Sequence, residues 1–205
     1  MPIRGTINLP GDKSISHRAL MLASLTGGEC VINNISTGED VETTRNCLSK
    51  CGIKSHKDGN TVRISGGPLK KPKSALYCGN SGTSVRLLAG LLAGQGISAE
   101  FTGDISLSKR PMNRIIEPLI QMGAHFKTND GCLPLSMSSN NLNSITYTLP
   151  IASAQVKSAI LLGGLGAEGE TVVHEIIKTR DHTEIMLLEI GAKLTVGEQI
   201  SINKL

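Results

Sequence analysis

Three stretches of the sequence are apolar on nearly every side of a helix, and they predict three buried helices. The stretches are KSISHRALMLASLTG, NSGTSVRLLAGLLAG and ASAQVKSAILLGGLG. A helix without a polar face belongs in a protein core rather than on its surface. We expect these helices to begin near Ser14, Ser81 and Ser153 and to run parallel through the interior.

A second pattern follows each of these helices. A β-branched strand leads through a polar loop into a helix with one apolar face, and that helix ends at Gly52, Gly123 or Gly191. Glycine is the residue expected just past a helix C-terminus. Two short strands joined by a turn come next. The three glycines recur at intervals of about 70 residues, which indicates an internal threefold repeat.

The repeat predicts an α/β fold of three βαβαββ units around a pseudo-threefold axis, with parallel helices inside and sheets outside. The units cover about residues 13–75, 76–145 and 146–205. If the central helices run the same way, their N-termini gather on one face of the molecule. A helix N-terminus offers unpaired N–H groups and a partial positive charge, so this face suits anions.

Polar side chains crowd into the start of the first helix: Lys13, Ser14, Ser16, His17 and Arg18. Cations close to a helix N-terminus are unfavourable unless something negative binds there. When the three helices are superimposed on their apolar stretches, Arg18, Arg86 and Lys157 align. The pattern therefore favours an anion site shared by the three helix starts.

A plainer interpretation is that Ser14, Ser81 and Ser153 only cap their helices, as serine often does. Capping alone does not explain a cation near each helix start, so we favour anion binding. Asp12, in Pro-Gly-Asp, is interpreted as a turn residue. Glu39 and Asp40 are expected to cap the second helix of the first repeat.

The composition narrows the class of ligand. The chain has 205 residues, a net charge of +4 and only 2% aromatic residues. Platforms for stacking nucleic-acid bases are therefore nearly absent, and we expect no nucleic-acid partner. A mildly basic chain of this kind suits small anionic ligands better.

The cysteines and the apolar segments indicate where in the cell the protein is expected to be. Five scattered cysteines without a Cys-x-x-Cys pair are typical of reduced thiols in the cytoplasm. Cys47, Cys51 and His56 could begin a zinc site, but the fourth ligand is missing, so we expect no metal and no cofactor. The apolar stretch 19–25 is too short to span a membrane. We expect a cytoplasmic protein without a membrane partner.

Four motifs together identify a resemblance to a known family. LPGDKSISHRA, GNSGTSVRLL, GDISLSKRPMNRIIEPL and SAQVKSAILL, in this order, resemble the signatures of 5-enolpyruvylshikimate-3-phosphate synthase. The resemblance covers nearly the whole chain and implies one lobe of a two-lobe fold, each lobe with three βαβαββ units. It also implies transfer of the enolpyruvyl group of phosphoenolpyruvate to the 5-hydroxyl of shikimate 3-phosphate, on the route to aromatic amino acids.

The resemblance assigns binding roles to residues of all three repeats. It implies that Lys13, Ser14 and Arg18 hold shikimate 3-phosphate, with Lys13 also reaching phosphoenolpyruvate. Ser153 and Gln155 match further residues around shikimate 3-phosphate. Both substrates are multiply charged anions, which guanidinium and ammonium groups are suited to bind.

The other implied contacts concern phosphoenolpyruvate and phosphate. Gly82 matches a glycine whose backbone faces phosphoenolpyruvate and beside which the inhibitor glyphosate competes. Arg110 matches an arginine that binds the same ligand, and Arg180 matches a further phosphate ligand. Arg86 either contacts the ligand, or only pairs with a carboxylate or braces its loop. His17 is interpreted as structural rather than as a general base.

The resemblance also implies that part of the machinery lies outside this chain. Family members have a second, C-terminal lobe, which supplies the groups that transfer protons, so no catalytic residue is assigned here. Residues 1–12 would form a strand and crossover that belong to that other lobe. We expect this N-terminal half to bind shikimate 3-phosphate without turnover.

Two other functions compete with this one. The sister enolpyruvyl transferase that acts on UDP-N-acetylglucosamine has a Lys-Asn pair near its start and a reactive cysteine in a loop. Here GDKSISHR and Lys109-Arg110-Pro111 stand in those places. A non-catalytic anion-binding module derived from the same lobe is the remaining alternative.

Overall fold

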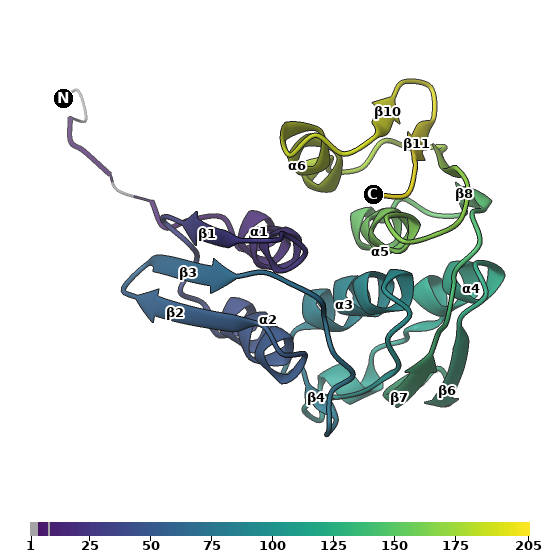
Figure 1. Ribbon diagram of the computed structural model, residues 1–205, viewed down its shortest axis with the longest axis horizontal. Helices are drawn as coiled ribbons and strands as arrows, with labels where there is room; N and C mark the ends of the chain where they lie inside the picture. The colour runs from purple at the N-terminus through teal and green to yellow at the C-terminus, as the bar shows by residue number, and fades with distance from the viewer. Residues whose placement is uncertain (1–3, 8) are drawn as a thin grey trace.

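The computed structural model describes residues 4–7 and 9–205, and it contains the predicted threefold repeat (Figure 1). The first repeat consists of α1 (Lys13–Ser24), β1 (Glu29–Ile32), α2 (Glu39–Lys50), β2 (Lys54–Asp58) and β3 (Thr61–Ser65). The second consists of β4 (Leu76–Tyr77), α3 (Gly82–Gly94), β5 (Ala99–Thr102), the short 3₁₀ helix η1 (Leu107–Lys109), α4 (Asn113–Gln121), β6 (His125–Asn129) and β7 (Cys132–Ser138). The third consists of β8 (Thr146–Leu149), α5 (Ala154–Gly164), β9 (Thr171–Glu175), α6 (His182–Glu189), β10 (Leu194–Val196) and β11 (Ile200–Ile202).

The three sheets share one strand order. The second sheet runs β4-β5-β7-β6 and the third β8-β9-β11-β10, and the first runs β1-β3-β2. In the second and third sheets the leading strand is parallel to its neighbour, whereas the other pairs are antiparallel. Each repeat therefore has the same topology, and the first sheet lacks the leading strand among the described residues.

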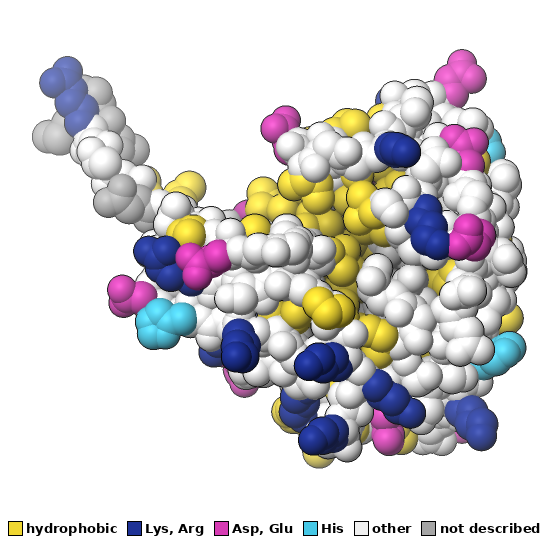
Figure 2. Space-filling view, viewed as in Figure 1, with side chains coloured by type: hydrophobic (Ala, Val, Ile, Leu, Met, Phe, Trp, Pro, Cys, Tyr) yellow, Lys and Arg dark blue, Asp and Glu magenta, His cyan; other side chains and the backbone are white. Residues whose placement is uncertain are grey.

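The first part of the N-terminal segment lies apart from the rest of the chain, whereas Gly11 packs closely against the main chain of Asn34. Residues 4–7 and 9–12 form neither helix nor strand, and Figures 1 and 2 show the segment projecting from the body of the molecule. Its apolar residues Ile7 and Leu9 are 82% and 75% exposed. The strand predicted within residues 1–12 falls partly on residues 1–3 and 8, which lie outside the described part of the chain.

The helices α1, α3 and α5 meet in the middle of the molecule, with the sheets around the outside (Figure 1). Their contacts show that they run in the same direction. Arg86 contacts Gln155 near the helix starts, Gly90 faces Ala159 halfway along, and Gly94 faces Gly163 near the ends. The C-terminal ends of all three helices then border one hollow of about 350 Å³. The predicted arrangement of parallel helices inside and sheets outside is confirmed.

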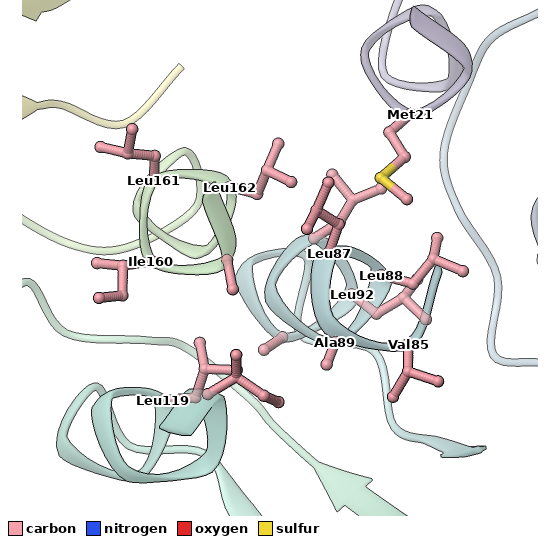
Figure 3. Close-up of a cluster of buried hydrophobic side chains, with 14 of the residues drawn as sticks. Met21, Val85, Leu87, Leu88, Ala89, Leu92, Leu119, Ile160, Leu161 and Leu162 are labelled. Carbon is pink, nitrogen blue, oxygen red and sulfur yellow. The ribbon is translucent and has the colours of Figure 1, made fainter. Parts of the chain in front are cut away.

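Close approach of α3 and α5 depends on glycine. A methyl group added at Gly90 would lie 2.2 Å from the main-chain oxygen of Ala159. Around this contact, leucine, isoleucine and methionine side chains from α1, α3, α4 and α5 fill the core, as Figure 3 shows. Figure 2 shows further hydrophobic side chains in the middle of one face, over the region where these helices meet. Burial of this shared core holds the three repeats together.

The helix ends correct two expectations. Asp12, expected in a turn, is the N-cap of α1, and its side chain accepts a hydrogen bond of 2.8 Å from the Ile15 amide. Gly38, rather than Glu39 or Asp40, is the N-cap of α2, and the two acidic residues stand in its first turn. Acidic side chains there favour the helix through its dipole instead of by capping.

The other helix ends agree with the sequence. Ser81 and Ser153 cap α3 and α5, and their hydroxyl oxygens accept from the amides of Ser84 and Val156. Gly52, Gly123 and Gly191 follow the C-caps of α2, α4 and α6 with φ of 92°, 105° and 80°. Glycine adopts this left-handed conformation without the penalty that a side chain would bring.

Candidate anion-binding site

The sequence-predicted site residues lie around the N-terminal ends of α1, α3 and α5. Lys13 and Ser14 stand in the first turn of α1, Gly82 begins α3, and Gln155 stands in the first turn of α5. Because the helices are parallel, their free N–H groups point to the same side. The fold therefore gathers the predicted residues on one face of the molecule.

Two guanidinium groups converge on Gly82. A methyl group added at Gly82 would lie 2.6 Å from Nη1 of Arg86 and 3.6 Å from Nη1 of Arg110. Within the described chain neither arginine forms an ion pair with a carboxylate. Burial, followed by the charges of Arg110 and Arg114, lowers the pKa of Arg86. Unneutralised cations that repel one another favour the arrival of an anion.

Neutral partners hold both arginines in place. Arg86 donates from Nη1 to Gln155 Oε1 at 2.9 Å and from Nη2 to the main-chain oxygen of Pro111 at 3.3 Å. Gln155 in turn donates from Nε2 to Thr83 Oγ1 at 2.9 Å. Arg110 donates to the side chain of Asn80. These contacts orient the guanidinium groups without cancelling their charge.

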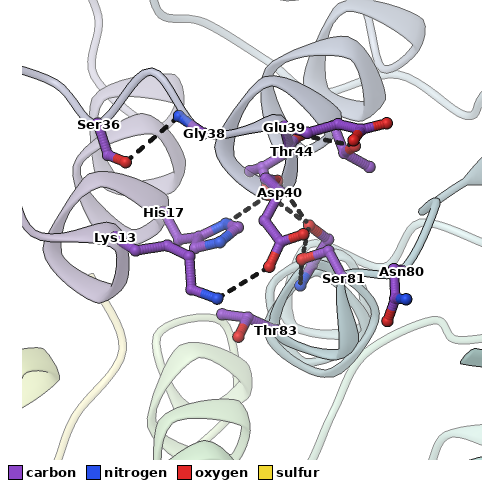
Figure 4. Close-up of polar contacts among 12 residues, drawn as sticks. Lys13, His17, Ser36, Gly38, Glu39, Asp40, Thr44, Asn80, Ser81 and Thr83 are labelled. Atoms are coloured by element: carbon purple, nitrogen blue, oxygen red, sulfur yellow. Dashed lines mark hydrogen bonds and ion pairs between the residues drawn. The ribbon is translucent and has the colours of Figure 1, made fainter.

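Lys13 is an exposed cation of the site. Its Nζ lies 2.9 Å from Asp40 Oδ2, and the two side chains are 56% and 30% exposed (Figure 4). The main-chain oxygen of Asp40 lies 3.4 Å from Ser84 Oγ, which brings the pair next to the start of α3. An exposed ion pair is worth only about 0–1 kcal/mol. A bound phosphate or carboxylate can therefore replace Asp40 at little cost.

Arg18 is the buried cation of the site, with only 5% of its surface exposed. Its three guanidinium nitrogens donate to Thr183 Oγ1 at 2.6 Å, to Ser158 Oγ at 2.6 Å and to the main-chain oxygen of Ser14 at 2.9 Å. Burial lowers the pKa of Arg18, and the nearby charge of Arg180 lowers it further. Arg180 itself is exposed. These two arginines add positive charge beside the start of α1.

A chain of hydroxyl groups joins the first two repeats beneath the site. Ser84 Oγ donates to Ser81 Oγ at 2.8 Å, Thr44 Oγ1 lies 2.7 Å from Ser84 Oγ, and His17 Nδ1 lies 2.7 Å from Thr44 Oγ1 (Figure 4). His17 is fully buried, and burial lowers its pKa to about 4. The imidazole is therefore neutral at pH 7, which supports the structural role expected for it.

The aligned cation of the third repeat does not belong to the anion site. Lys157 is buried, and its ammonium group pairs with Glu175 and Glu184. The interpretation of Arg18, Arg86 and Lys157 as three equivalent anion-binding cations is wrong for Lys157. The sequence alignment on apolar residues carried no information about the two carboxylates that approach from β9 and α6.

The structure also adds residues that the sequence did not single out. Asn80 and Thr83 orient Arg110 and Gln155, while Ser158 and Thr183 hold Arg18. All four are small polar residues. Asn80, Thr83 and Thr183 stand in a loop or at helix starts, where ordinary capping explains such residue types equally well, and Ser158 lies inside α5. Only their long-range contacts in the structure distinguish these residues from ordinary capping residues.

In the described chain, no three His, Cys, Asp or Glu side chains gather as a metal site would require. Cys47 and Cys51, considered above as the start of a zinc site, are both buried, and the nearest thiol contact of Cys47 is Cys78 at 4.0 Å between the sulfur atoms. No helix of the described residues is long and apolar enough to cross a bilayer.

Comparison with known proteins gives consistent matches. The family model described as EPSP synthase (3-phosphoshikimate 1-carboxyvinyltransferase) matches residues 1–203. The 3-phosphoshikimate 1-carboxyvinyltransferase of Koribacter versatilis is 48% identical over 195 residues, which are 94% of this chain and 46% of the relative. That of Ruthia magnifica is 48% identical over 200 residues, which are 96% of this chain and 46% of the relative.

The solved structures agree with the sequence matches. An EPSP synthase from Acinetobacter baumannii superimposes with a TM-score of 0.93 at 47% identity, over 98% of this chain and 47% of that chain. The chain thus spans about half the length of the relatives that it matches.

Proposed function

Because the chain belongs to the EPSP synthase family, we propose that it supplies the substrate-binding lobe of an enolpyruvyl transferase. In the proposed reaction, the 5-hydroxyl oxygen of shikimate 3-phosphate forms a bond to C2 of phosphoenolpyruvate. The bond between C2 and the phosphate oxygen breaks, phosphate leaves, and the hydroxyl proton passes to the surroundings. Such a reaction brings two strongly charged anions together, so it requires a concentrated set of cations.

One observation carries this proposal. Arg86 and Arg110 converge on the backbone at Gly82, and neither is neutralised by a carboxylate of the described chain. An anion that approaches Gly82 meets two forked donors and the start of a helix. We assign phosphoenolpyruvate to this position, with Lys13 reaching it from α1.

We assign shikimate 3-phosphate to the neighbouring surface between α1 and α5. Lys13, Ser14 and Arg18 border it on one side, and Ser153 and Gln155 on the other. Arg180 is assigned as a further phosphate ligand, because its charge lies close enough to lower the pKa of Arg18. Arg86 connects the two substrate positions through its hydrogen bond to Gln155. Arg86 can therefore contact a substrate and also brace its surroundings, so the two interpretations are compatible.

We propose that a second lobe closes over this face and supplies the proton-transferring groups. The open edge of β1 and the projection of residues 4–7, 9 and 10 support an exchange of strands with that lobe. Residues 13–205 then form the present lobe, with repeats at 13–75, 76–145 and 146–205. The proposed setting is the cytoplasm.

The proposal is tested by measuring phosphate release from phosphoenolpyruvate in the presence of shikimate 3-phosphate. We expect no turnover by this chain alone. We expect turnover after adding the separately produced part of the Acinetobacter baumannii enzyme that this chain does not match. Robust turnover by this chain alone would contradict the division of labour between lobes. If the chain binds shikimate 3-phosphate but shows no turnover, either alone or with the added part, the non-catalytic anion-binding module would be favoured.

A further inference from the structure

A buried group of charges in the third repeat lies next to the anion site. Lys157, in α5, is 1% exposed and donates to Glu175 Oε2 at 2.9 Å, and its ammonium also pairs with Glu184 Oε1. Glu184 is 2% exposed, and its Oε2 has no hydrogen-bond partner in the described chain. Burying three charges is costly, so an arrangement of this kind calls for an explanation beyond stability.

Arg18 contacts residues that flank the same group. Its hydrogen-bond partners Ser158 and Thr183 are the residues next to Lys157 and Glu184 in the sequence. The charge of Glu184 is close enough to raise the pKa of Arg18 against the effect of burial. Yet Arg18 donates only to neutral oxygens and forms no ion pair with Glu184. The carboxylate instead pairs with Lys157.

We propose that Lys157 is a positioning residue that keeps Arg18 available for anions by pairing with Glu184. Lys157, Glu175 and Glu184 together carry a net charge of −1. Without Lys157 the two carboxylates would carry −2 beside Arg18. Glu184 would then have as nearby cations Arg18 and Lys178, which lines the same pocket. The Arg18 guanidinium would then turn toward Glu184, and its attraction for a substrate phosphate would fall. This inference rests on the proposed function, because it assumes that Arg18 binds an anion.

The same arrangement fixes a loop of the site. Glu175 Oε1 accepts from the main-chain amide of Thr179 at 3.1 Å and also from its hydroxyl group, while Oε2 accepts from Lys157. The loop between β9 and α6 that carries Arg180 is therefore tied to α5 through Glu175. Lys157 thus acts on two proposed ligands, one through charge and the other through position.

The test compares four variants by the dissociation constant for shikimate 3-phosphate at pH 7, with unfolding in urea measured separately. Lys157→Met should weaken binding by about tenfold, since one buried unit charge is lost beside the site. Glu184→Gln should tighten binding several-fold, because it removes negative charge near Arg18. The double variant should return to within about twofold of the parent chain. Lys193→Met, which removes an exposed lysine of the same repeat, is the matched control and should bind as the parent does.

Lys157→Met and Glu184→Gln are expected to change the dissociation constant in opposite directions, and this separates an electrostatic role of Lys157 from a merely structural one. If Lys157 only maintained the packing of α5, Glu184→Gln would weaken binding or leave it unchanged, and the double variant would show no rescue; either result would overturn the inference. Glu184→Gln retains Lys157, so it decides the question even if Lys157→Met fails to fold. If the parent chain binds no shikimate 3-phosphate, the proposed function fails instead. The Arg18 Nε–H signal in NMR then tests the charge relationship alone: it should shift in Lys157→Met and return in the double variant, and an unshifted signal would refute it.

Discussion

The guanidinium of Arg86 donates a hydrogen bond of 2.9 Å to the side-chain oxygen of Gln155, although 69 residues separate the two in the chain. That separation is about one repeat, and the bond joins the second turn of α3 to the first turn of α5. It holds a cation beside Gly82 while leaving the charge unpaired. We propose that contacts of this kind let a site spread over three repeats act as one cradle for anions.

Substitution of Gly82 tests this cradle. The methyl group of Gly82→Ala would stand 2.6 Å from Arg86 Nη1, so the flexible end of Arg86 must leave Gln155. We expect stability to change by less than about 1 kcal/mol, since no backbone atom has to move. In the reconstituted two-lobe mixture, we expect weaker binding of phosphoenolpyruvate and a larger loss of affinity for glyphosate, for which the family resemblance implies a position beside this glycine. Equal losses for both ligands, measured by competition, would contradict the assignment of Gly82.

The buried His17 predicts a pH dependence of stability. Burial lowers its pKa from 6.5 to about 4, so between these values the unfolded chain binds a proton that the folded chain does not. The neutral, buried His17 therefore makes its full contribution to the free energy of unfolding above pH 6.5. As the pH falls from 6.5 to about 4, the free energy of unfolding decreases by about 3 kcal/mol, because the unfolded chain takes up a proton that the folded chain does not. Urea unfolding at pH 7 and pH 4.5 should show a smaller loss for His17→Asn than for the parent chain. Parallel pH profiles for the two proteins would show that His17 is not buried in its neutral form.

A pair of helix glycines tests the close contact between α3 and α5. Gly90→Ala would bring its methyl group to 2.2 Å from the Ala159 main-chain oxygen, so the two helices would have to separate. We expect a loss of about 2–3 kcal/mol in the free energy of unfolding, despite the better helix propensity of alanine. Gly163→Ala is the matched control. Its methyl group would lie 3.4–3.5 Å from the Leu119 and Met122 side chains, an ordinary contact, so stability should stay the same or rise by up to about 1 kcal/mol. Similar losses for both variants would argue against the packing described for α3 and α5.

The repeats and the face of the site could be predicted from sequence because both depend on local patterns. The apolar stretches, the glycines after α2, α4 and α6, and the polar helix starts are each visible within a few residues of the chain. Asp12 shows the limit of such patterns. An aspartate after Pro-Gly suits a turn and a helix N-cap equally well, and only the position of the Ile15 amide decides between them.

The role of Lys157 could not be predicted for a different reason. Its sequence context resembles that of Arg86, but its partners Glu175 and Glu184 come from β9 and α6. Whether a cation faces a ligand or a carboxylate of the same chain depends on such long-range contacts. The hydrogen bonds of Arg18 to Ser158 and Thr183 belong to the same category, with separations of 140 and 165 residues.

The central claim is that the N-terminal ends of α1, α3 and α5 form one site for shikimate 3-phosphate. A titration followed by NMR tests it most directly, with Lys13→Ala, Arg18→Ala and, as the control, Lys204→Ala at the opposite ends of the helices. We predict that the amide signals of the first turns of the three helices shift together. We also predict that Lys13→Ala and Arg18→Ala each weaken binding, Arg18→Ala by about tenfold or more because its charge is buried, while Lys204→Ala binds as the parent chain does. Signals that do not move, or binding that survives the loss of both Lys13 and Arg18, would contradict the claim.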